Sequence, residues 1–128
     1  MALSKIDILK VKELKRELVN IPEWGGDVWV QEMTGVQRDR FDTWVVEKKE
    51  TGGMRLRIVI ATVVDEEGKP MFSDIDIPDL ASKSGKAIER LSDVGMRLSG
   101  MTEEAKKEEI KNSEEDLNDD SSSVSVVN

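Results

Sequence analysis

The amino-acid sequence predicts a mainly helical α+β fold, in which an N-terminal β-hairpin packs on about three to four helices. Three observations support this prediction. Two short extended runs flank a Pro/Gly turn at residues 22–26, and apolar residues recur at helical spacing further along the chain. The final residues are acidic and poor in large apolar groups. The 128 residues are therefore expected to form one globular domain over 1–112, followed by a disordered acidic tail over 113–128.

The hairpin is predicted at about residues 14–33. In its second run, Val28 and Val30 alternate with polar or aromatic neighbours, as in a strand that buries one face. Pro22 cannot continue a central strand, and the pair Gly25-Gly26 accommodates the positive φ angles of a tight reversal. The chain is therefore expected to turn between the two runs.

Helices are predicted to follow the hairpin, at about residues 34–49, 54–64, 84–99 and 102–112. Thr34 and Gln37 have the spacing of a capping box, which marks the start of the first helix. The second segment is ambiguous, because its apolar stripe fits a helix while its β-branched residues fit a strand. The stripe is long and complete, which favours the helix.

The net charge of −8 is concentrated at the C-terminal end. Residues 102–128 contain nine acidic residues and three lysines, which gives −6 and leaves −2 for the first 101 residues. The lysines near the N-terminus lack interleaved aromatic residues, so no nucleic-acid partner is expected. No apolar run approaches the ~20 residues of a membrane span, and no signal peptide is evident.

The composition indicates a protein that is not an enzyme. Cysteine, histidine and tyrosine are absent, which removes thiol chemistry and the commonest general base and metal ligand. No glycine-rich phosphate loop is present. No catalytic residue, cofactor or metal is therefore predicted.

Two groups of acidic residues could suggest other chemistry. Asp74, Asp76 and Asp79 lack the spacing of a calcium loop, and we expect a solvated edge in which Ile75 and Ile77 point inward. The adjacent acids of residues 65–67 precede a Gly-Lys-Pro turn, which is typical of an exposed loop rather than of a catalytic carboxylate pair.

The tryptophans are the candidate partner-binding residues. The chain has three, Trp24, Trp29 and Trp44, among only five aromatic residues. Trp29 is out of phase with Val28 and Val30, so it faces away from them, and an exposed tryptophan is a favoured interface anchor. The alternative is that the chain's own helices cover that face. Trp24 in the turn either plugs the core or contacts a partner.

Two strings resemble a known family. The string from Val19 to Val30, with Met33-Thr34-Gly35 after it, is similar to the start of the tail assembly chaperones of long-tailed (siphovirus, lambda-like) bacteriophages. The string from Val64 to Phe72, and a helix that reaches Leu98-Ser99, also resemble this family. The similarity covers about residues 7–112.

The resemblance implies a chaperone that coats the aggregation-prone tape measure protein, in the cytoplasm of the infected bacterial host, and is absent from the mature virion. It also implies a longer form, made by translational frameshifting, that recruits tail tube protein. This chain would then be the short form, self-associating into an open head-to-tail oligomer. Two alternatives remain: a structural component of the tail or head–tail joint, and an acidic inhibitor of a host DNA-binding protein.

Overall fold

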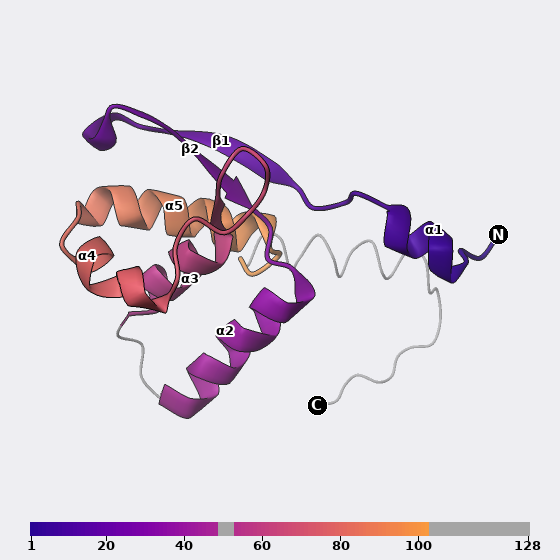
Figure 1. The fold of residues 1–128 in the computed structure, drawn as a ribbon. Helices are drawn as coiled ribbons and strands as arrows, with labels where there is room; N and C mark the ends of the chain where they lie inside the picture. Colours follow the sequence, from indigo (N-terminus) through magenta and orange to yellow (C-terminus); the bar gives the residue numbers. More distant parts are fainter. Residues whose placement is uncertain (49–52, 103–128) are drawn as a thin grey trace.

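The computed structural model describes residues 1–48 and 53–102. In this part of the chain, a three-stranded antiparallel sheet in the order β1-β2-β3 is accompanied by helices (Figure 1). The strands are β1 (Arg16–Ile21), β2 (Gly26–Gln31) and β3 (Val63–Val64). The helices are α1 (Lys5–Lys10), α2 (Gly35–Lys48), α3 (Met54–Thr62), α4 (Ile77–Ala81) and α5 (Gly85–Leu98), with short 3-10 turns η1 (Pro22–Trp24) and η2 (Asp74–Asp76). The predicted fold class, an N-terminal hairpin with helices, is confirmed.

The hairpin consists of β1 and β2, which are shorter than the predicted range of 14–33. Val19 pairs with Val28, and the η1 turn connects the strands. Gly25 closes this turn with a φ of 74°, a conformation that favours glycine. Next to the turn, the Asn20 side-chain amide donates a hydrogen bond of 2.9 Å to Asp27. Turn geometry and cross-strand pairing therefore fix the same register.

The predicted helix over 54–64 ends two residues early. Residues 54–62 are helical, but Val63 has extended backbone angles, and Val63 and Val64 pair with Val30 and Trp29 of β2. The expectation of a helix through residue 64 is wrong at these two positions. Their β-branched side chains favour extended backbone, and the free edge of β2 supplies the pairing partner.

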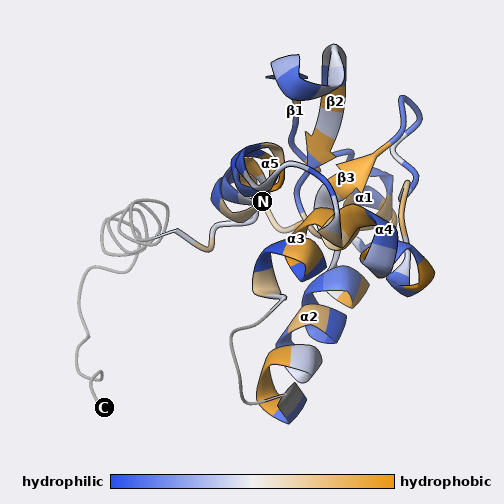
Figure 2. Cartoon of the chain, turned by 90° about the vertical axis from the view of Figure 1, so that its left-hand side faces the viewer, coloured by the Kyte–Doolittle hydropathy of each residue, from blue (hydrophilic) through white to orange (hydrophobic). Residues whose placement is uncertain are grey.

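The main core lies between the sheet, α3 and α5. Ala87, Ile88 and Leu91 form the buried face of α5, in the helix that the sequence predicted at 84–99. They cluster with buried residues of the strands and of α3 and α4, namely Val19, Ile21, Val30, Val59, Val63 and Leu80. In Figure 2, β3 and much of α3 have hydrophobic colours and lie among the other elements. Apolar burial at this junction joins the hairpin to the helices.

Helix α2 packs against α3 through a second, smaller cluster. Its start has the predicted capping box, because Thr34 and Gln37 exchange hydrogen bonds of 2.8 and 3.2 Å. Phe41 is buried with Met33 and Ile58, and Trp44 and Val45 pack against them. Phe41, Trp44 and Val45, spaced at i, i+3 and i+4, therefore lie on the inner face of this helix.

The segment before α4 differs from the expectation. Ile75 was expected to point inward, but 83% of its surface is exposed. Residues 74–76 form the 3-10 turn η2, in which side chains do not alternate between two faces as in a strand. Asp76 accepts a hydrogen bond of 2.9 Å from the Ser73 N–H and so caps this turn.

Helix α1 was not predicted. Ser4 and Asp7 form a capping box, but no residue of the helix is buried. Apart from Thr102, the predicted helix over 102–112 and the predicted tail over 113–128 lie outside the described residues. Within 1–48 and 53–102, no helix combines the length and the hydropathy that crossing a membrane requires.

Candidate functional site

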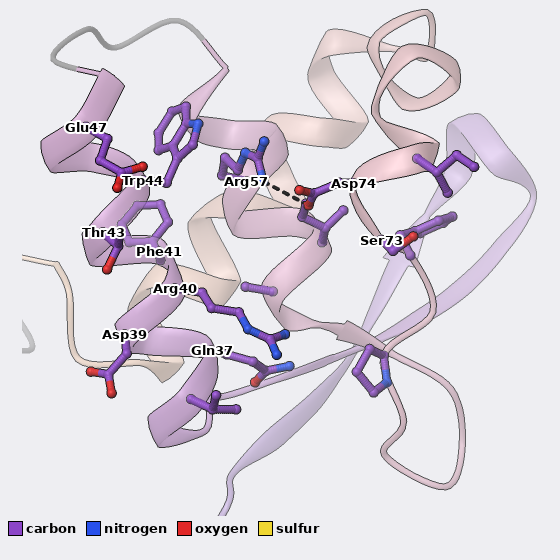
Figure 3. Close-up of a pocket in the computed structure, with 16 residues that line it drawn as sticks. Gln37, Asp39, Arg40, Phe41, Thr43, Trp44, Glu47, Arg57, Ser73 and Asp74 are labelled. Carbon is purple, nitrogen blue, oxygen red and sulfur yellow. Dashed lines mark hydrogen bonds and ion pairs between the residues drawn. The ribbon is translucent and has the colours of Figure 1, made fainter.

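A groove runs between α2 on one side and α3 with residues 70–75 on the other. Its volume is about 830 Å³. Phe41, Trp44, Ile60, Ala61 and Phe72 supply apolar lining, and acidic and basic side chains from both sides complete it. In Figure 3, Gln37, Arg40 and Trp44 extend from α2 toward α3. An apolar groove with charged edges suits the apolar face of a helix from another protein.

The Trp44 end of the groove is held by stacked and charged contacts. The ring centroids of Phe41 and Trp44 are 6.2 Å apart. The Arg57 guanidinium lies 5.4 Å from the Trp44 ring centroid and forms an ion pair of 2.9 Å with Asp74. Arg57 thus links α2, α3 and η2, and its cation–π contact keeps one face of Trp44 occupied.

The outer face of the sheet holds the second candidate tryptophan. Trp29 lies opposite Leu18 in the β1–β2 register, and the Arg16 guanidinium stacks 4.4 Å from its ring centroid. Arg16 also donates a hydrogen bond of 2.9 Å to the Glu66 carbonyl oxygen. As a result Trp29 is half-buried while Leu18 is exposed. The cover on Trp29 therefore includes the Arg16 side chain, which its hydrogen bond to Glu66 holds in place.

The three tryptophans occupy three different places. Trp24 lies in the η1 turn at the tip of the hairpin and is exposed, Trp29 lies on the outer sheet face, and Trp44 lies in the groove. Figure 1 shows the hairpin tip far from α2. The structure therefore gives three separate aromatic positions rather than one aromatic cluster.

Two ion pairs that the sequence did not indicate tie the hairpin to α5. Arg90 donates two hydrogen bonds, of 2.8 and 3.1 Å, to the Glu23 carboxylate, and Arg97 donates one of 2.9 Å to Glu17. The Arg90 hydrogen bonds, helped by a backbone hydrogen bond, lower the pKa of Glu23 from 4.5 to about 2. The partners are 67 and 80 residues apart, so no local pattern could identify them.

The Glu23–Arg90 pair predicts a pH-dependent contribution to stability. Because folding lowers the pKa of Glu23, the pair stabilises the folded state fully above about pH 4.5 and loses its effect as the pH falls toward 2. We expect Glu23→Gln to lower the melting temperature at pH 7, and the gap to wild type to close between pH 4.5 and 2. Thermal melts across this range measure the gap, and Arg90→Gln should reproduce it. A gap that stays constant with pH would contradict the assignment.

The acidic groups have structural tasks. Asp65 accepts hydrogen bonds from the backbone N–H groups of Lys69 and Glu67, at 3.0 and 2.9 Å, which lower its pKa. It thereby shapes the turn in which Gly68 has a φ of 87°. Asp74 pairs with Arg57 and Asp76 caps η2. Among residues 1–48 and 53–102, no group of three acidic side chains is placed to hold a metal ion.

Comparison with known proteins finds similarity at the level of the fold. No protein-family model and no curated protein sequence matches the chain. Among solved structures, the tail assembly chaperone of bacteriophage HK97 is similar, with a TM-score of 0.53 and 23% sequence identity. The match covers 70% of this chain and 85% of the HK97 protein. The chain therefore shares the fold of the HK97 tail assembly chaperone.

Proposed function

We propose that this chain is a tail assembly chaperone of a long-tailed bacteriophage, a protein that binds other proteins and catalyses no reaction. The observation that carries the proposal is the fold, which matches most of the HK97 tail assembly chaperone. The resemblance of residues 19–30 and 64–72 to that family, noted from the sequence, points the same way. Fold and local sequence are separate features, and both favour the same role.

In this role the chain keeps the tape measure protein soluble in the host cytoplasm until the tail tube assembles, and it does not remain in the virion. A longer, frameshifted form of the chain recruits tail tube protein, while the short form self-associates head to tail. Such a protein needs exposed apolar contacts on a charged scaffold rather than a catalytic group. The groove and the outer sheet face both supply such contacts.

We assign the tape measure contact to the outer sheet face, at Trp29 and the exposed Leu18. The two side chains are cross-strand neighbours on the hairpin, with Leu18 exposed and Trp29 partly exposed beside the Arg16 guanidinium. Trp24 lies apart from these two residues, at the exposed tip of the same hairpin, and is a separate candidate contact. Trp44, the third candidate, belongs to the separate groove.

The test is co-expression with the tape measure protein from the same phage. Wild-type chain should shift the tape measure protein from the pellet to the soluble fraction and co-purify with it. Trp29→Ala and Leu18→Asp should lose this effect while still folding, because both side chains are at least partly exposed. The loss in unfolding free energy should stay below the ~3–5 kcal/mol of a buried aromatic residue. Val46→Glu, an exposed change on α2, is the control.

The outcomes separate the proposal from its alternatives. A tape measure protein that stays insoluble with wild-type chain contradicts the chaperone role. Purified phage tails that contain stoichiometric amounts of the chain favour a structural component instead. A Trp29→Ala variant that folds and co-purifies normally leaves the role intact but excludes the outer sheet face as the contact.

A further inference from the structure

Residues 1–11 form an arm that extends away from the rest of the described chain (Figure 1). Its large apolar side chains are all at least half exposed: Met1, Leu3, Ile6, Ile8, Leu9 and Val11. Among the described residues, the hydrogen bonds of the arm join only its own members, such as Ser4 with Asp7. A six-residue helix that buries nothing is unstable alone in water, and so many clustered apolar side chains indicate a contact surface.

The direction of the arm is set at its root. The Lys15 N–H donates a hydrogen bond of 3.0 Å to the Glu32 side chain, and the Lys15 carbonyl oxygen accepts one of 2.8 Å from the Glu32 N–H. These bonds hold the chain at the start of β1, where residues 11–14 and the start of α2 enclose a hollow of about 420 Å³. From this root the arm extends away from α2 and α3, the helices on the two sides of the groove (Figure 1).

The groove has the size and the charge to receive this arm. Helix α2, with 14 residues, is about 21 Å long, and α1, with six residues, is about 9 Å long. The charged lining of the groove has three acids (Asp39, Glu47 and Asp74) and two bases (Arg40 and Arg57), which gives −1. Residues 1–12 have three lysines and one aspartate, which gives +2. Apolar and charged features of the two surfaces are therefore complementary.

We propose that the arm of one copy docks in the groove between α2 and α3 of a second copy, with Ile6 and Leu9 against its apolar lining. This contact deepens the proposed self-association and rests on it. The arm and the groove lie on different parts of the same chain, so the interface is heterologous. When two copies dock, one arm and one groove stay free to bind further copies. The product is an open head-to-tail oligomer. Because α1 has only six residues, we expect one arm to bury less than the ~800 Å² per partner of a standard interface and the association to be reversible.

The experiment uses two variants that fail at opposite ends of the contact. The arm variant combines Ile6→Asp with Leu9→Asp and places charges on the apolar surface of the arm. The groove variant combines Val36→Glu with Ile75→Glu and places charges in the lining of the groove. All four side chains are more than half exposed, so the core is unchanged. Val46→Glu is the matched control, because Val46 is also an exposed valine on α2 but does not line the groove. Sedimentation velocity at rising protein concentration measures the mass, and circular dichroism checks folding.

Wild type and Val46→Glu should form species that grow with concentration, whereas each double variant should remain at the 14.4 kDa monomer. An equal mixture of the two double variants should stop at twice that mass, because only one intact arm and one intact groove remain to meet. Deletion of residues 2–11 should behave as the arm variant does.

Three results would overturn the inference. The first is a monomeric wild type, which would also result if the arm folded into the groove of its own chain. The second is a double variant that still oligomerises. The third is a mixture of the two double variants that does not form the paired species. The tape measure solubility test on the same variants stays separate, because it depends on the outer sheet face. Failure of the arm contact therefore leaves the chaperone role to be judged by its own result.

Discussion

Replacing Leu91 with alanine is expected to lower the free energy of unfolding by about 2–5 kcal/mol. Leu91 is fully buried on α5 and clusters with residues from the hairpin, α3 and α4. Truncation removes apolar contacts and leaves a cavity where the sheet and the helices meet, and a close-packed interior fills such a space only in part. The effect is large because one helix face connects the hairpin to the other elements.

Urea unfolding followed by circular dichroism measures this loss. Leu18→Ala removes the same atoms from an exposed position on the outer sheet face, and we expect it to change stability by less than about 1 kcal/mol. A Leu91→Ala variant as stable as wild type would show that α5 does not hold the sheet in solution. Equal losses at both leucines would show that Leu18 on the outer sheet face is as well buried as Leu91 in the core.

The features predicted from the sequence are those whose cause is local. The Thr34–Gln37 capping box lies within four residues, and the buried face of α5 repeats at helical spacing. The hairpin turn follows from Pro22 and from the positive φ of Gly25. In each case the residues that determine the structure are also the residues that adopt it, so a pattern is sufficient.

Some of the features that were missed depend on partners distant in the sequence, and others have local causes. Val63 and Val64 continue a helical stripe, and only pairing with β2 makes them a strand. The outward position of Ile75 depends on the η2 turn, which Asp76 caps. The short helix α1 has a capping box at Ser4, which is a local signal in the sequence. No residue of this helix is buried, so no apolar stripe facing a core follows that signal.

Only part of the candidate site could be predicted from the sequence. Alternation with Val28 and Val30 indicates the sheet face of Trp29, but not the Arg16 guanidinium that stacks on it. The groove needs α2, α3 and residues 70–75 side by side, and no single segment encodes that arrangement. Tryptophan content therefore pointed to candidate residues, whereas the surface that we propose for self-association emerged only from the fold.

Gly95 shows how a single residue can depend on a contact that the sequence does not display. It is buried on α5 where that helix crosses α3. A Cβ atom there would lie 2.6 Å from Thr62 Oγ1 and 3.1 Å from both Thr62 Cβ and Ile58 Cγ2. Thr62 cannot simply rotate away, because its hydroxyl is buried and donates a hydrogen bond of 2.7 Å to the Ile58 carbonyl oxygen.

Gly95→Ala is therefore expected to destabilise the protein by about 1–3 kcal/mol, and Gly95→Val by more, because overpacking forces α3 and α5 apart. Alanine favours a helix over glycine by up to ~1 kcal/mol, which the strain at this crossing outweighs. Gly85→Ala, at the start of the same helix, is the control: a Cβ there meets nothing within 4 Å, so no loss is expected. Urea unfolding of the three variants measures the order. If Gly95→Ala were as stable as Gly85→Ala, the close crossing of α3 and α5 would be absent in solution.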